Sequence, residues 1–227
     1  LWILLMNILF YKVFVNESRM KVIILSLLVL LLPIFISHLI YLDFEDEDDK
    51  TINVLIVQPN VDPYTDKFSK GHKEQLAHFI TLAKTKLTKE TQLLLGPETV
   101  LLEGIWENKL EVSYSVRVFR ELQNEFPNLN VLLGATTYKL FANGEQRTNT
   151  ARKLRNEQVF YDVYNSAVFI SDSGNTHVYH KTKLVPGAEK MPFPYFLDPL
   201  AKFAINLGGI SGSLGSKNYL NSFLVDK

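Results

Sequence analysis

The stretch Leu93–Glu103, LLLGPETVLLE, joins an apolar run, a turn signal and an acid. The run of leucines is typical of a short strand buried on both faces. It stops at Gly96-Pro97, a pair typical of a turn, and Glu98 follows at once. In layered α/β folds catalytic groups gather at the ends of strands, so Glu98 is a candidate catalytic group. The alternative is a solvated loop acid.

A second polar residue follows a later strand-like run. The segment Tyr179–Phe193, YHKTKLVPGAEKMPF, places Lys181 just past the end of that run. A carboxylate and an ammonium in one sheltered cleft can move a proton, and the lysine can also donate to a developing oxyanion. We therefore expect Glu98 and Lys181 to converge at one rim of a sheet. The alternative for Lys181 is an exposed lysine that ends an edge strand.

Around these two points, helices alternate with strands at first, and strands then pair directly. This order predicts an α/β fold with a mixed sheet. No GxGxxG follows the first strand, which argues against a Rossmann domain. The predicted strands are Ile52–Asn60, Thr91–Glu98, Asn128–Tyr138, Val159–Ile170 and Asn175–Lys181. The predicted helices are Gly71–Leu87 and Leu110–Phe126. We expect a hairpin turn at Ser171–Gly174, a loop or hairpin tip at Ala142–Gln158 and a loop at Gly208–Gly215.

The composition argues against nucleic-acid binding and against a metal site. The formal net charge of +0 argues against a nucleic-acid binder that relies on phosphate contacts. The sequence contains no Cys, and its histidines lack ligand spacing, so we expect no metal site and no cofactor. We expect His177 and His180 to be surface residues. Asn165 and Tyr179 are expected to serve packing and strand-end hydrogen bonding.

The N-terminal part predicts a membrane segment. Residues 22–41 carry no formal charge, and about 20 helical residues cover the roughly 30 Å hydrocarbon core. Pro33 is tolerated there as a kink. The alternative is a cleaved signal peptide, but the run is too long and no small-residue cleavage site follows it. Residues 1–11 look like the end of an earlier span.

Charge predicts the orientation of this segment. The link between the two apolar runs is basic, with Lys12, Arg19 and Lys21, whereas residues 43–50 are strongly acidic. Basic flanks stay in the cytoplasm, so the remainder of the chain is expected outside. In a bacterium this is the periplasmic side of the inner membrane.

Three motifs together resemble the nitrilase superfamily and, more narrowly, the apolipoprotein N-acyltransferase family of bacterial inner membranes. They are IVQPNVD (residues 56–62), GPE (96–98) and the 179–193 segment. In that family membrane-spanning helices precede a periplasmic nitrilase-like domain. The family pattern Tyr-x-Lys-x-x-Leu-Val-Pro-x-x-Glu-x-x-Pro matches here at Tyr179, Lys181, Leu184, Val185, Pro186, Glu189 and Pro192.

The resemblance implies roles for three residues. Glu98 is the general base, Lys181 is the oxyanion-stabilising member of a Glu-Lys-Cys triad, and Glu189 orients the lysine or the acceptor amine. The implied reaction passes an acyl chain from a phospholipid, through a cysteine thioester, to the N-terminal diacylglyceryl-cysteine of an apolipoprotein. Two features depart from the pattern: the Cys-Tyr-Glu segment is absent, and Phe68 is the nearest counterpart of a tryptophan in the loop after the first strand.

The resemblance also sets the expected domain organisation. Residues 1–42 form one or two transmembrane helices, 43–50 an acidic linker, and 51–227 a nitrilase-like α-β-β-α sandwich that is incomplete. Both ends look cut from a longer multi-pass protein, and without a thiol the chain by itself is expected to be inactive. Two alternatives stay open: a membrane-tethered amidase of the nitrilase type, and a non-catalytic membrane-anchored scaffold.

The orientation can be tested by reporter fusion. A reporter that is active only outside the cytoplasm, fused after Lys227, is expected to be active because the basic link stays inside. Activity of a cytoplasm-only reporter at the same site would contradict the predicted orientation.

Overall fold

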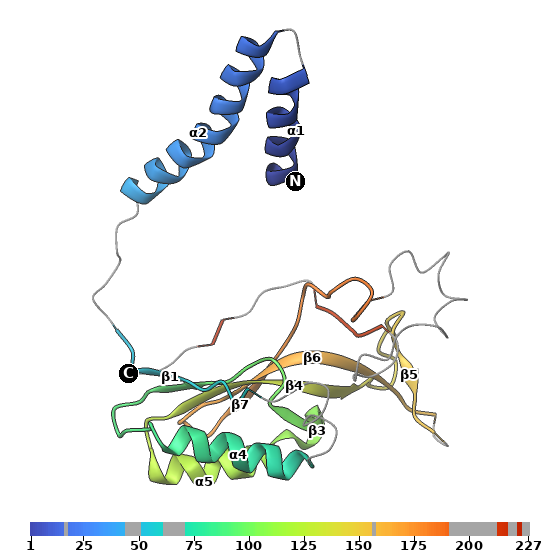
Figure 1. The fold of residues 1–227 in the computed structure, drawn as a ribbon. Helices are drawn as coiled ribbons and strands as arrows, with labels where there is room; N and C mark the ends of the chain where they lie inside the picture. Colours follow the sequence, from blue (N-terminus) through green and yellow to red (C-terminus); the bar gives the residue numbers. More distant parts are fainter. Residues whose placement is uncertain are drawn as a thin grey trace. The chain divides into compact units, whose positions relative to one another are not determined.

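The computed structural model divides into two compact units, Leu1–Thr51 and Ile52–Lys227. Figure 1 traces the elements of both along the chain. Several expectations fall outside the described residues, namely those on most of the acidic linker, on Phe68 and on most of the Gly208–Gly215 loop. The structure describes residues 1–15, 18–43, 51–60, 71–155, 158–190, 213–217 and 222–223.

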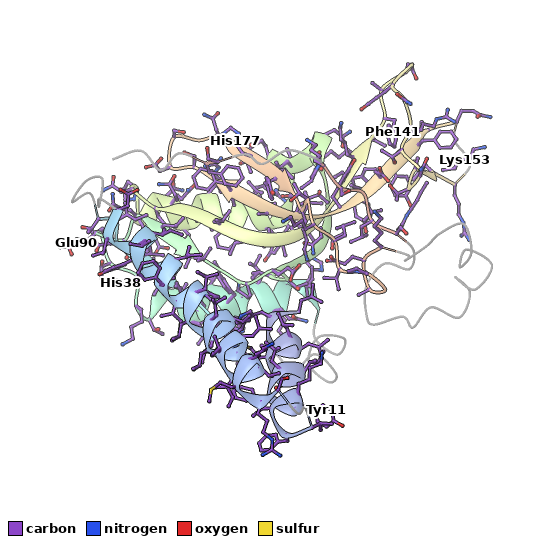
Figure 2. All side chains as sticks on the ribbon, turned by 90° about the horizontal axis from the view of Figure 1, so that it is seen from above. Tyr11, His38, Glu90, Phe141, Lys153 and His177 are labelled. Carbon is purple, nitrogen blue, oxygen red and sulfur yellow. The ribbon has the colours of Figure 1, made fainter. Side chains whose placement is uncertain are left out.

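The N-terminal unit contains two helices, α1 (Trp2–Val15) and α2 (Arg19–Asp43). Among the described residues, α2 is the helix that is long and apolar enough, by length and composition, to cross a membrane. The predicted span of residues 22–41 and its Pro33 lie inside α2. Most side chains of both helices project outward and are apolar (Figure 2). This is the composition expected of a helix surrounded by lipid.

The second unit is built on a seven-stranded sheet within the described residues. Its strand order is β1-β2-β4-β6-β5, and β3 also pairs with β4 while β7 pairs with β6. The strands β1, β2 and β3 run parallel to β4, whereas the pairs β4–β6, β5–β6 and β6–β7 are antiparallel. The predicted α/β class with a mixed sheet is therefore confirmed. The strands are β1 (Val54–Ile56), β2 (Leu93–Leu95), β3 (Leu101–Trp106), β4 (Asn130–Leu140), β5 (Arg152–Lys153), β6 (Phe160–Ile170) and β7 (Thr176–His180).

Two helices, α4 (His72–Lys84) and α5 (Tyr114–Glu125), lie side by side on one face of this sheet (Figure 1). Their apolar faces bury Phe79 and Phe119, whose rings meet edge to face with centroids 6.2 Å apart. Such a pair adds about 0.5–1.5 kcal/mol to the free energy gained by burial. Alternate apolar residues of β4 and β6, including Val168, complete the core from the sheet side.

The structure differs from the sequence-based elements at two places. The predicted helix Leu110–Phe126 is broken, because Ser113 is extended and its side chain caps α5 by accepting a hydrogen bond from the Val116 amide. The residues before this cap form the 3₁₀ helix η1 (Glu107–Val112). Strand β3 was not predicted, since Gly104, at a φ of 65°, interrupts the alternation of side chains in that run.

The far end of the sheet holds a second small difference. Part of the predicted loop Ala142–Gln158 forms β5, which pairs antiparallel with β6. Phe141, directly after β4, and Lys153, on β5, flank Phe160 of β6 from its two sides (both are labelled in Figure 2). The loop is therefore anchored to the sheet at both of its ends.

The Gly-Pro-Glu turn after β2 is held against β4. The Gly134 amide donates to the Pro97 carbonyl (3.1 Å), and the Val100 amide donates to the Gly134 carbonyl (3.2 Å). A β-carbon at position 134 would lie 1.9 Å from the Glu98 carbonyl oxygen. Only glycine at position 134 therefore lets the backbone at Glu98 approach β4 so closely.

The variant Gly134→Ala is expected to lose stability and to displace Glu98, because backbone atoms block the added methyl group. Overpacking of this kind typically costs roughly 1–3 kcal/mol in the free energy of unfolding. Urea unfolding of the purified protein measures the change. Gly71→Ala is the control, since a β-carbon there meets nothing within 4 Å, and a loss of about 1 kcal/mol or less is expected at such a helix cap. Equal losses in both variants would contradict the close approach.

Candidate active site

Glu98, Lys181 and Glu189 meet at one place. The Lys181 ammonium donates to Glu98 Oε1 at 2.7 Å and to Glu189 Oε1 at 2.9 Å. Glu98 and Lys181 are separated by 83 positions in the chain. The prediction that their side chains converge is therefore confirmed, and Glu189 joins them as a second carboxylate on the same ammonium.

Each of the three side chains is placed by a different part of the fold. Glu98 lies on the turn that β4 holds. Lys181 follows the last residue of β7, and its amide donates to the Asn165 carbonyl at 2.8 Å. Glu189 lies in a tight turn in which its own Oε2 accepts from the Val185 amide at 2.7 Å. The site therefore depends on the sheet for two of its groups and on a self-closed turn for the third.

Asn165 is a site residue that sequence reasoning did not assign. Its Nδ2 donates to Glu98 Oε1 at 2.5 Å and to Glu189 Oε1 at 2.7 Å. The sequence holds a signal for it, because counting outward from the Ser171–Gly174 turn places Asn165 opposite Lys181 on the paired strand. In the observed register Ser166 pairs with His180, one position away. Asn165 therefore bridges the two carboxylates beside the lysine.

The alternation of side chains along β6 decides the face on which this site lies. Val168 and Ile170 point into the core beneath α4 and α5. Asn165 is an odd number of positions away from both, so it points to the opposite face. The site therefore lies on the sheet face that α4 and α5 do not cover.

The charges of the site stabilise one another. Hydrogen bonds from Lys181 and then from Asn165 lower the pKa of Glu98. Partial burial disfavours the Lys181 ammonium, but the hydrogen bonds to Glu98 and Glu189 outweigh it and raise the pKa of Lys181. Burial also disfavours the Glu189 carboxylate, yet hydrogen bonds from the Val185 amide, Asn165 and Lys181 lower its pKa. At neutral pH the site therefore holds two carboxylates and one ammonium.

The two carboxylates differ in what they can do. The Glu98 side chain is 60% exposed, and its hydrogen bonds from described residues reach Oε1. The Glu189 side chain is 14% exposed and has both oxygens bound. Glu98 can therefore accept a proton from a reactant, whereas Glu189 can orient its neighbours. Lys181 uses two of its three N–H donors on the carboxylates, which leaves one for a developing negative charge.

The expectation of a surface position is wrong for His180 and confirmed for His177. His180 is 2% exposed, and its Nε2 lies 2.5 Å from Glu107 Oε1. Its ring stacks on Tyr164 with centroids 3.7 Å apart. His177 is exposed. The two histidines are an odd number of positions apart, so strand alternation places them on opposite faces.

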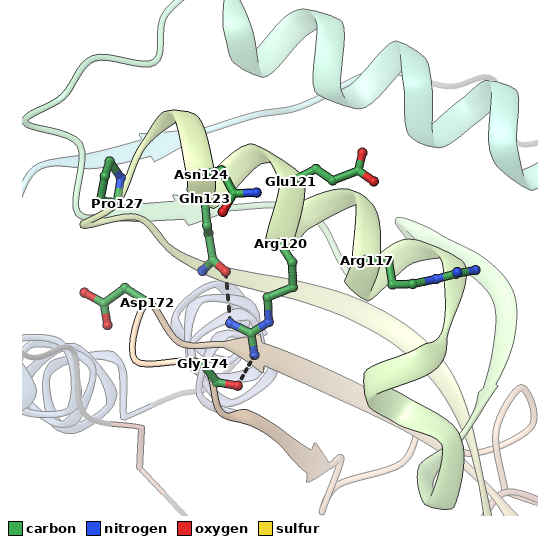
Figure 3. A pocket seen from close by; sticks show the side chains of 8 residues that line it. All are labelled: Arg117, Arg120, Glu121, Gln123, Asn124, Pro127, Asp172 and Gly174. Carbon is green, nitrogen blue, oxygen red and sulfur yellow. Dashed lines mark hydrogen bonds between the residues drawn. The ribbon is translucent and has the colours of Figure 1, made fainter.

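A hollow of about 580 Å³ lies between α5 and the turn that joins β6 to β7, away from the site. The guanidinium of Arg120 donates there to Gln123 Oε1 at 2.9 Å and to the Gly174 carbonyl at 2.6 Å (Figure 3). It also donates to the Ser171 carbonyl and to Thr176. Arg120 is thus committed to holding the turn, at the end of β7 opposite to Lys181.

The geometry defines a class of site: one lysine paired with two glutamates on an α/β domain, a set of groups that can exchange protons and donate to an anion. Among the described residues, no group of three His, Cys, Asp or Glu side chains could hold a metal ion. No protein-family model matches the chain.

Sequence comparison relates the chain to a protein that its name describes as an acyltransferase. The chain is 24% identical over 220 residues to the apolipoprotein N-acyltransferase of Chlorobaculum tepidum, a match that covers 92% of this chain and 40% of that protein. The chain therefore spans well under half the length of this relative. Among solved structures, a crystal structure of an N-terminal amidase with an Asn-Glu peptide matches at 16% identity and a TM-score of 0.37, over 59% of this chain and 28% of that one.

The variant Lys181→Met is expected to show how this site contributes to stability. The folded-state pKa values of Glu98 and Glu189 lie below the ordinary 4.5. The stabilisation by Lys181 is therefore fully present above about pH 4.5 and is lost as pH falls through those lowered values. The difference in unfolding free energy between wild type and Lys181→Met should shrink over this acid range.

The same difference should also shrink at high pH, as the pH rises through the raised pKa of Lys181. Urea unfolding at a series of pH values measures it. Lys183→Met, an exposed lysine two positions on, is the matched control and should show a smaller pH dependence. A difference for Lys181→Met that stays constant into acid would contradict the pairing.

Proposed function

We propose that this chain is the acid–base part of a membrane-bound acyltransferase. The enzyme moves an acyl chain from a phospholipid to the N-terminal diacylglyceryl-cysteine of an apolipoprotein. The observation that carries the proposal is the Lys181 ammonium at 2.7 Å from Glu98 and 2.9 Å from Glu189. The similarity to an apolipoprotein N-acyltransferase supports the acyl-transfer class.

The nucleophile in this proposal is a cysteine thiol that lies outside the given sequence, which contains no Cys. Glu98 is ionised at neutral pH because its pKa is lowered, so it can take the thiol proton. The resulting thiolate attacks the ester carbonyl of the phospholipid, and the remaining N–H of Lys181 donates to the oxyanion. The lysophospholipid leaves with the proton from Glu98, and the acyl group stays on sulfur as a thioester.

The second half of the reaction uses the same groups in turn. The free amine of the lipoprotein N-terminus attacks the thioester, and Lys181 again donates to the oxyanion. Glu98 takes a proton from the attacking nitrogen and returns it to the departing thiolate. Glu189, with both oxygens bound, keeps Lys181 in position during both steps. A covalent intermediate lets two large lipids use one site one after the other.

We propose the inner membrane of a bacterium as the location, with the second unit on the periplasmic side. The apolar helix α2 supports a membrane attachment. The basic residues Arg19 and Lys21 at the start of α2 support a cytoplasmic position of that end. Membrane attachment suits the reaction, because both substrates are lipids held in the bilayer.

Two variants of the full-length protein test the proposal. Glu98→Gln is expected to fold but to lose the base, which typically costs about 10²–10⁴ in rate. Lys181→Ala is expected to lose one oxyanion donor, typically about 10²–10³. Thioester formation from a labelled phospholipid and the mass of the acylated acceptor report the two steps. Lys183→Ala is the control and should react at the wild-type rate. Normal acylation by both site variants would refute the proposed roles.

A further inference from the structure

A buried polar cluster lies behind the site, on the other face of the sheet. We call it the His180 cluster; its members are His180, Glu107, Thr137 and Ser166. Glu107 Oε1 lies 2.5 Å from His180 Nε2 and accepts from Thr137 Oγ1 at 2.9 Å. Thr137 and Ser166 hydroxyls lie 2.7 Å apart. His180, Thr137 and Ser166 are all at most 3% exposed, so this network connects β4, β6 and β7 inside the protein.

The cluster and the site share the same two strands at adjacent positions. Ser166 pairs with His180 in the β6–β7 register. Asn165 comes directly before Ser166, and Lys181 comes directly after His180. Their side chains point to the opposite face by alternation, and the Lys181 amide donates to the Asn165 carbonyl at 2.8 Å. The residues on the site face are therefore the immediate chain neighbours of buried, hydrogen-bonded residues.

His180 is the last residue of β7, and Lys181 follows it directly. The buried contact of His180 therefore fixes the end of the strand next to Lys181. Within the described residues, His180 Nδ1 is buried without a hydrogen-bond partner. Glu107 therefore orients the ring through Nε2, while Tyr164 supports it by stacking at 3.7 Å. The contact at this strand end involves a carboxylate, and hydrogen bonds to a charged group are the stronger kind.

We propose that His180 and Glu107 are positioning residues for Lys181, holding the end of β7 so that the ammonium stays between Glu98 and Glu189. The inference rests on the proposed acyl-transfer function for its kinetic part. Neither residue contacts the reacting atoms in this scheme. Catalytic groups must be held within about 0.5 Å of their productive position, and a misplacement of about 1 Å can cost about 10²-fold in rate.

Two variants of the full-length protein separate the hydrogen bond from the stacking. His180→Gln keeps an amide donor near the position of Nε2 but loses the ring. His180→Phe keeps the ring on Tyr164 but loses the donor. If the hydrogen bond positions Lys181, the Phe variant should lose about 10²-fold in kcat with little change in KM for the phospholipid, and the Gln variant should recover most of the loss. Glu107→Met removes the acceptor of the same hydrogen bond and should show the same loss as the Phe variant. It replaces His180→Phe in the test if that variant does not fold.

A second readout does not depend on acyl transfer. An amine-reactive reagent, followed site by site with mass spectrometry, measures how freely the Lys181 amine reacts. It should label slowly in wild type and in His180→Gln, and several-fold faster in His180→Phe and Glu107→Met. His177→Phe and His177→Gln, the same changes on the exposed face of β7, are controls and should behave as wild type in both assays.

The outcomes separate this inference from the proposed function. If wild type transfers no acyl group but the labelling pattern holds, the function is wrong and the positioning role stands. If His180→Phe keeps both its kcat and slow labelling, the positioning role is overturned. It is also overturned if His180→Gln, which keeps the donor, is as impaired as His180→Phe, because keeping the hydrogen bond would then not be enough to position Lys181.

Discussion

An ammonium group between two carboxylates is the interaction on which the architecture of the site depends. Lys181 has two negative partners, Glu98 and Glu189, which lie in two different turns of the chain. Removing the ammonium would leave two carboxylates close together without compensation, whereas removing one carboxylate would leave an ion pair. The surrounding structure must therefore hold three backbones at once, and much of its hydrogen bonding can be understood from that requirement.

The sheet supplies the common frame for these backbones. Strand β4 holds the Glu98 turn through Gly134, and it pairs along its length with β6, which carries Asn165. Strand β7 pairs with β6 and delivers Lys181 at its end. Because β4 and β6 are the long central strands and contribute buried residues to the core beneath α4 and α5, the site rests on a well-buried part of the sheet. Function in such an arrangement is carried by turns and strand ends on a rigid support.

The unequal exposure of the two carboxylates gives them different chemical characters. Glu98 is open to a reactant and is held on one oxygen, whereas Glu189 is enclosed and held on both. A group that must exchange protons needs access, and a group that must orient a neighbour needs fixed geometry. Asn165 donates to both carboxylates at once, so it links the accessible group to the enclosed one without adding charge.

The sequence by itself determined the α/β class, the apolar N-terminal helix and the three charged residues of the site. These features are local: hydrophobic period, turn signals and a motif at fixed spacing can each be read within a short window. The convergence of Glu98 with Lys181 also followed, since strand ends in one sheet share a rim.

Only the tertiary structure decided the roles of Asn165, His180 and Gly134. Each is an ordinary residue in its own segment and acquires a role through a partner far along the chain. The register of β6 against β7 places Asn165 beside the lysine, and His180 is buried against Glu107 instead of lying at the surface as expected. Gly134 matters because another backbone passes within contact distance of it. The contacts of His180 and Gly134 depend on chain segments that cross far along the sequence, which no local pattern of residue types encodes; the place of Asn165 opposite Lys181 could have been counted from the hairpin turn.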